Sequence, residues 1–265
     1  MNKTLKYSLT AACSLVLLHA SEAALIGINF DGRAGGAGSG GLLDPSAFAG
    51  VISQSRFNNV ARAQYSPPDN NKSVNTTFSN LIDSDAQVTT VSFTISADDS
   101  WNSGAGTGSA NATLMNGIIK ARSAGDDNGT PRQTVVPMSF GGLTPGDAFT
   151  IHIYTMENGT GGQYSLSDGT TTYFQEAQNG PAFNETFIQG VNTAPSPGPV
   201  ANYVTFTGVV GAGGNLPLTY TWISGSDGVG IAGAQIQTTA VPEPTAFLML
   251  ASGAGMLGML RRRRS

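Results

Sequence analysis

The sequence predicts an all-β protein whose body, residues 24–240, is a single β-sandwich of jelly-roll type with one short helix. Three observations predict this fold. Apolar and polar residues alternate with a period of two along many short segments, as they do in half-buried strands. Turn signals rich in Gly, Pro, Asn and Ser separate these segments. Glycine makes up 35 of 265 residues and only 11% of the residues are charged, which is typical of an exported β protein with many turns.

The clearest strand runs from Phe149 to Tyr154, where the odd-numbered positions are apolar and the even-numbered ones more polar. A Pro-Gly turn at Leu143–Gly146 precedes it. Residues 91–95 alternate in the same way, and Ser167–Gly169 is typical of a hairpin turn. Further strands are expected at Leu25–Phe30, Val135–Phe140, Gln163–Leu166, Thr171–Gln175, Tyr203–Val209, Leu218–Ile223 and Val229–Gln237.

One segment has a different period. Apolar residues in Ala112–Arg122 recur at helical spacing, which predicts a short helix that caps one end of the sandwich. Gly117 lies in its middle and costs about 1 kcal/mol relative to alanine. The Gly- and Ser-rich stretch Ser100–Asn111 before it is expected to be a solvent-facing loop.

The first 23 residues are typical of a secretory signal peptide. Lys3 and Lys6 supply a positive start, residues 9–18 are mostly apolar, and small residues favour cleavage after Ala23. The chain's one cysteine, Cys13, lies in this segment. Cleavage would therefore leave a body without disulfides or thiolate metal sites.

The charge of the body excludes one class of partner. Between Ala24 and Leu260 there are seven basic and sixteen acidic residues, a net charge of about −9. Nucleic acids and anionic membranes are bound by basic patches. The sequence therefore predicts no nucleic-acid binding.

The last 25 residues combine three parts in a fixed order. Pro242, Glu243 and Pro244 form a short motif, residues 245–260 are apolar, and Arg261, Arg262, Arg263 and Arg264 follow. A helix of the apolar part would be about 24 Å long, which is shorter than the roughly 30 Å hydrocarbon core. The arginines would stop that end in the cytoplasm, so the body would face outward.

This order resembles the PEP-CTERM sorting signal of Gram-negative bacteria. The resemblance implies that exosortase, a membrane-embedded cysteine-type transpeptidase, recognises Pro242–Pro244 and cuts at or near them. The protein would be held transiently in the cytoplasmic membrane by its C-terminal helix and then pass to the cell surface or the exopolysaccharide matrix. The alternative is a plain C-terminal anchor. Within the body, Val229–Ile236 resembles the last strand of carbohydrate-binding jelly rolls.

Candidate catalytic groups are few. His152 is the only histidine after the predicted cleavage site, and its place on the polar face of a strand predicts that it is exposed or at a sheet edge. A hydrolase triad needs a base oriented by a carboxylate beside a nucleophile, and nothing near His152 supplies one. We therefore expect no catalysis of this kind.

Acidic pairs point to calcium as a possible ligand, because Ca²⁺ takes oxygen donors from flexible loops. The best run is Asp126, Asp127 and Asn128, and the pairs Asp83/Asp85 and Asp98/Asp99 are further candidates. Ordinary solvated turn residues are the alternative interpretation.

Trp101 is the candidate sugar contact. It lies in the predicted loop, away from any apolar stripe, and an exposed indole can stack on a sugar ring while Asp98 and Asp99 accept hydrogen bonds from its hydroxyls. Trp222, by contrast, alternates with apolar strand residues and is expected in the core.

Three functions remain open from the sequence. The preferred one is a non-catalytic surface or matrix protein associated with exopolysaccharide. The others are a carbohydrate-binding module and a glycan-active hydrolase that uses paired aspartates. Sandwich folds host all three, so the fold alone does not choose among them.

Overall fold

The computed structural model of the chain describes most of the predicted body. The residues that it describes are 24–32, 41–60, 74–97, 99–121, 126–127, 130–131, 133–196, 198–225 and 229–239. The predicted signal peptide, with its cleavage site at Ala23, lies outside these residues. So does the C-terminal signal, with Pro242–Pro244 and Arg261–Arg264.

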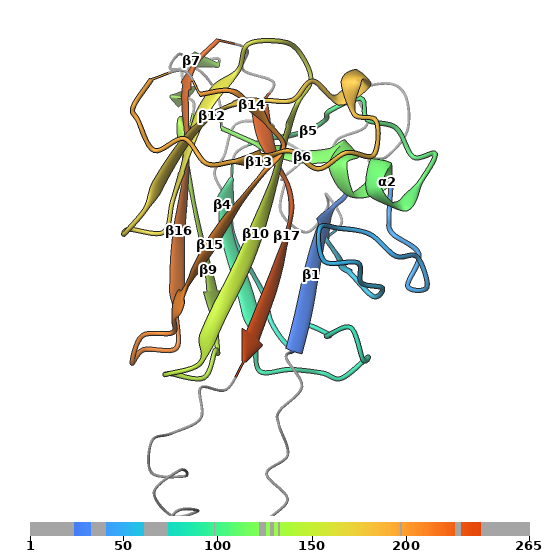
Figure 1. Ribbon diagram of the computed structural model, residues 1–265, viewed down its shortest axis with the longest axis vertical. Coiled ribbons are helices and arrows are strands. Elements are labelled where there is room, and N and C mark those ends of the chain that lie inside the picture. Colours follow the sequence, from blue (N-terminus) through green and yellow to red (C-terminus); the bar gives the residue numbers. More distant parts are fainter. Residues whose placement is uncertain are drawn as a thin grey trace, which may run out of the picture.

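Two facing β-sheets form the body (Figure 1). The strands of the first sheet, sheet A, are in order β13 (Gln189–Gly190), β15 (Tyr203–Val209), β10 (Ala148–Glu157), β17 (Val229–Thr239), β1 (Ala24–Phe30) and β2 (Asn58–Val60). Beside this path, β6 (Gly117–Lys120) pairs with β17, and β5 (Asp99–Asn102) pairs with β6.

The second sheet has seven strands. Their order is β14 (Val200–Ala201), β12 (Thr172–Ala177), β11 (Gln163–Ser167), β16 (Leu216–Ser224), β9 (Val135–Gly141), β4 (Ser92–Ala97) and β3 (Val74–Phe78). A separate two-stranded ribbon joins β7 (Asp126–Asp127) to β8 (Thr130–Pro131). The prediction of a two-sheet sandwich is confirmed, and each strand expected from the alternating pattern is present to within a few residues.

An inner core fills the space between the sheets. Along β10, Phe149, Ile151 and Ile153 face this core, as the alternating pattern predicted. The Ser167–Gly169 hairpin also forms, because the Asp168 carboxylate accepts backbone N–H bonds from Thr170 and Thr171. The inner core therefore follows directly from the period-two pattern.

An outer core covers the other face of sheet A, which the sequence did not predict. Its buried members are Leu43, Ala49, Phe57, Leu114, Met115, Ile118, Tyr154, Met156 and Ala232. The helix α2 (Ala110–Asn116) packs on β10 and β17 and contributes Leu114 and Met115 (Figure 1). Central strands of sheet A are thus buried on both faces.

A bulge in β17 helps to fill both cores. The pairing with β10 runs from Tyr154–Gly233 directly to Thr155–Ile231, so Ala232 has no partner in β10. Ala232 therefore turns to the outer core, while Ile231 and Ala234 both face the inner core.

The predicted helix Ala112–Arg122 is wrong in its second half. Ser109 caps α2 by accepting the Ala112 N–H at 3.0 Å, but the helix ends at Asn116. Gly117 then lies so close to β1 that a Cβ atom there would be 1.8 Å from the Phe30 carbonyl oxygen. Ile118 and Ile119, which suggested helical spacing, lie instead on the buried strand β6 and face opposite cores.

Candidate functional site

The predicted sugar contact, Trp101, lies on a strand and not in a loop. β5 pairs with β6, so the expectation of a loop over Ser100–Asn111 is wrong at its start. The indole is half-buried and packs on the outer core, and the ammonium of Lys120 lies 5.5 Å from its ring centroid. Asp98 lies outside the described residues, and of Asp99 the structure describes only the backbone.

Three further aromatic residues pack on the same outer core. Phe187 lies at their centre, with ring centroids 5.5 Å from Tyr154, 5.8 Å from Phe183 and 6.2 Å from Tyr203. Phe183, Phe187 and Tyr203 are each half-buried, whereas Tyr154 is fully buried below them. We call Trp101, Phe183, Phe187 and Tyr203 the outer aromatic surface.

Buried amides fix the segment that carries the two phenylalanines. This segment follows the 3-10 helix η1 (Gly180–Ala182). The side chain of Asn202 is fully buried, accepts the Ile188 N–H at 2.8 Å and donates to the Thr186 carbonyl at 2.8 Å. It also donates to the side chain of Gln178. These bonds to a buried side chain hold the segment that carries the phenylalanines in one position.

Two titratable rings in and below this surface, Tyr203 and His152, are uncharged. His152 is buried under it, with Nδ1 2.9 Å from the Thr205 hydroxyl and its ring 5.9 Å from that of Tyr203. Burial lowers the pKa of His152 and raises the pKa of Tyr203, so both rings are uncharged at neutral pH.

The prediction that His152 is exposed or lies at a sheet edge is therefore wrong. Its strand, β10, lies between β15 and β17, and the outer layer covers the face that was expected to meet solvent. Trp222, in agreement with its prediction, packs on the inner core, although it is only partly buried.

The acidic pairs divide into those that the structure describes and those that it does not. Asp83 is buried, and its Oδ1 accepts the backbone N–H groups of Asp85 at 2.9 Å and Gln87 at 2.8 Å. Its carboxylate therefore holds a turn.

Asp126 and Asp127 lie on β7, with only their backbone described, and Asn128 lies outside the described residues. Within the described part of the chain, no three His, Cys, Asp or Glu side chains form a metal-ligand group. Calcium binding at 126–128 stays a prediction.

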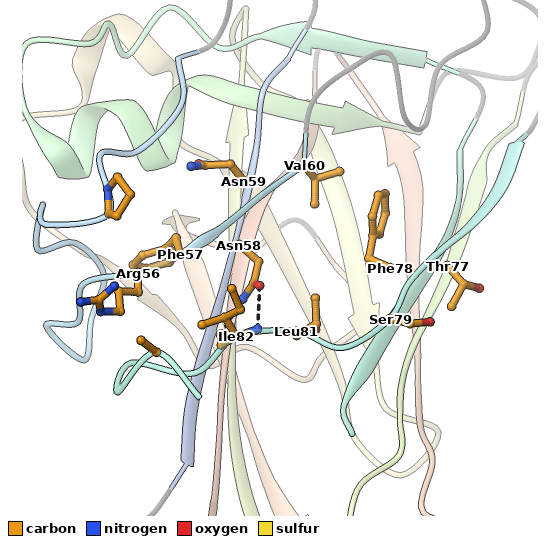
Figure 2. Close-up of a pocket in the computed structure, with 12 residues that line it drawn as sticks. Arg56, Phe57, Asn58, Asn59, Val60, Thr77, Phe78, Ser79, Leu81 and Ile82 are labelled. Carbon is orange, nitrogen blue, oxygen red and sulfur yellow. Dashed lines mark hydrogen bonds between the residues drawn. The ribbon is translucent and has the colours of Figure 1, made fainter. Parts of the chain in front are cut away.

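A pocket that no sequence signal suggested lies where the edges of the two sheets meet. Figure 2 shows it between the segment Arg56–Val60 and the segment Thr77–Ile82. Its volume is about 630 Å³. Val60 and Leu81 are core residues at its base. Of the described residues that line it, Arg56 is the one with a charge.

The polar walls of this pocket are already bonded within the protein. The Asn58 side chain accepts the Ile82 N–H and donates to the Gly27 and Ile82 carbonyls, at 2.8–2.9 Å (Figure 2). The Asn59 side chain accepts the Leu43 N–H at 2.9 Å and donates back to its carbonyl at 2.8 Å. These amides join the edges of the sandwich and are not free to recognise a ligand.

Both ends of the described body lie at the same end of the sandwich. β1 begins at Ala24, which is the antiparallel partner of Thr238, and β17 ends at Thr239 (Figure 1). None of the helices in the described part of the chain has the length and hydropathy to span a membrane.

Comparison with protein-family models places a PEP-CTERM protein-sorting motif at residues 240–264. The chain therefore carries a PEP-CTERM sorting signal. The motif marks it as an exported protein that exosortase processes, as the resemblance implied. The matched residues begin directly after the last strand of the sandwich, so the sorting tail is joined to the folded body without a spacer domain. No curated protein matches the chain.

Proposed function

We propose that this protein is a non-catalytic component of the cell surface or extracellular matrix that associates with exopolysaccharide. The observation that carries the proposal is the outer aromatic surface. Phe183, Phe187 and Tyr203 are part-exposed rings on a layer that buried amides hold in place. Aromatic rings offer flat apolar area with little entropy to lose, which suits the apolar face of a sugar ring.

The uncharged rings of this surface favour a glycan over a charged partner. His152 is uncharged below it, and the body as a whole is acidic. Side chains with hydrogen-bonding capacity, such as Thr205 and Gln189, flank Tyr203, whose hydroxyl donates to Gln189 Oε1 at 3.5 Å. Polar groups next to rings are what recognition of sugar hydroxyls requires.

Two placements support a binding role over hydrolysis. The imidazole of His152 is hydrogen-bonded to a threonine hydroxyl, whereas a catalytic base is oriented by a carboxylate. The Asp83 carboxylate is engaged in holding a turn. Among the described residues, His152 is thus not placed as a triad base, and Asp83 is placed as a turn residue.

A carbohydrate-binding module is the second candidate, and the fixing of Phe183 and Phe187 favours it. A preorganised surface of this kind would bind short, defined oligosaccharides in addition to the polymer. Binding of short oligosaccharides on a glycan array would support the module, and retention by the polymer alone would support the matrix role.

The test is co-sedimentation of the purified protein with the exopolysaccharide of its own host. Phe187→Ala should weaken binding about fivefold, since one aromatic contact is worth about 1 kcal/mol. Phe48→Ala is the matched control, because Phe48 is 64% exposed and belongs to neither core. Each variant is first shown to unfold cooperatively. Equal binding by Phe187→Ala and the wild type, or equal loss with Phe48→Ala, contradicts the proposal.

A further inference from the structure

The sorting motif is tied closely to one end of the folded sandwich. We define the exit pole as the strand ends Ala24, Val209 and Thr239 together with the loops 143–147 and 210–214. The two loops are joined by backbone bonds, Gly146 N–H to Val210 O at 2.9 Å and Leu143 N–H to Gly214 O at 3.1 Å. Ala148 links this pair of loops to the end of the chain, because it pairs with Thr239 on one side and Val209 on the other.

The length of chain beyond the sandwich limits where the motif can lie. Pro242 is three residues past Thr239, the last residue of β17. An extended chain spans at most about 3.6 Å per residue. The motif therefore starts within about 11 Å of the strand end, and the apolar stretch from Thr245 starts within about 22 Å of it.

A folded processing enzyme is much wider than this distance. An enzyme that grips Pro242–Pro244 while β17 stays paired must also touch what surrounds the strand end. Strands are about 4.8 Å apart, so Val209, two strands from Thr239, lies about 10 Å away. It falls within the footprint of any such enzyme.

We propose that the exit pole is a docking surface for the membrane-embedded transpeptidase that processes the tail. The inference rests on the assignment of the sorting motif. The pole presents small and apolar groups to this partner: Val209 is 63% exposed, and Thr144, Pro145, Ala212 and Gly213 are also exposed. Among the described residues of the pole, Asp147 is the one charged side chain.

The test is pulse-chase processing of the full chain in its host, read as the ratio of the precursor to the shortened form. Val209→Glu should slow processing at least threefold, because it places a charge in the contact. Val191→Glu is the matched control, since Val191 is 66% exposed on the segment after β13 and not at the pole. Equal melting temperatures of the purified variants show that both fold.

A longer tail, inserted into both the wild type and Val209→Glu, tests whether the slower processing of Val209→Glu comes from lost docking. A twelve-residue Gly/Ser insertion between Ala240 and Val241 lets the motif reach the enzyme without the pole, so Val209→Glu should then process at the rate of the inserted parent. The docking proposal is overturned if Val209→Glu is processed as fast as the wild type in the chain of native length. It is also overturned if Val209→Glu slows processing equally in the chains with and without the insertion. If the wild type itself keeps Ser265 and is never shortened, the sorting assignment fails instead.

Discussion

Glu157→Gln should raise the stability of the protein at neutral pH and lose this advantage in acid. Glu157 ends β10 and is 1% exposed. Its Oε2 accepts the Gly162 N–H at 3.0 Å. Burial raises the pKa of this carboxyl, and the nearby charge of Glu176 raises it further against the effect of that hydrogen bond. The folded protein therefore holds its proton more tightly than the unfolded chain does.

The direction of the pH dependence follows from this raised pKa. Below the unfolded value of about 4.3, Glu157 is protonated in both states and its full contribution to stability is present. As the pH rises through the folded pKa, the buried group must ionise and that contribution is lost. Glutamine cannot ionise, so the free energy of unfolding of the variant should exceed that of the wild type by an amount that grows between pH 3 and pH 8.

Each unit by which the pKa is raised corresponds to about 1.4 kcal/mol. For a domain of this size, 1 kcal/mol shifts the melting temperature by about 2–4 °C. The assay is urea and thermal unfolding of both proteins across pH 3–8, with Glu185→Gln as control because Glu185 is exposed. A difference that is constant with pH, or that grows toward acid, would refute the reasoning.

Three further predictions concern the packing at Gly117, a calcium site and the C-terminal tail. Gly117→Ala should destabilise the protein by at least about 2 kcal/mol in urea unfolding, because its Cβ would meet the Phe30 carbonyl, whereas Gly108→Ala meets nothing within 4 Å and should stay within about 0.5 kcal/mol. If residues 126–128 hold Ca²⁺, a hundredfold excess over the dissociation constant adds about 2.7 kcal/mol, and equal melting temperatures in EDTA and millimolar Ca²⁺ exclude this site. Mass spectrometry of surface-extracted protein should find a chain without Arg261–Arg264, and an intact C-terminus would count against processing.

Strands with an unbroken period were the easiest to predict from the sequence. β9, β10 and β15 each place apolar residues in the inner core at every second position. β5 and β6 were missed because they are four residues long and exist only through pairing with each other and with β17. The helical spacing of Leu114 and Ile118 was misleading because Gly117 ends the helix between them.

The candidate site was harder to predict because it depends on an outer layer. The alternation along β10 placed His152 on a solvent face, and nothing local reveals that the side chain is buried there against Tyr203 and Thr205. Trp101 was expected in a loop away from any apolar stripe, but it lies on β5 and packs on the outer core, whose members come from distant segments. Phe183 and Phe187, two rings four residues apart in a polar segment, were a signal that sequence reasoning left unused.

The central claim is that glycan binds at the outer aromatic surface, and tryptophan fluorescence tests it most directly. The chain has two tryptophans, Trp101 on the outer core and Trp222 on the inner one. Titration with the host exopolysaccharide should produce a saturable change in Trp222→Phe, in which Trp101 alone reports, and no change in Trp101→Phe. A change confined to the variant that keeps Trp222, or no change in either variant, would contradict the claim.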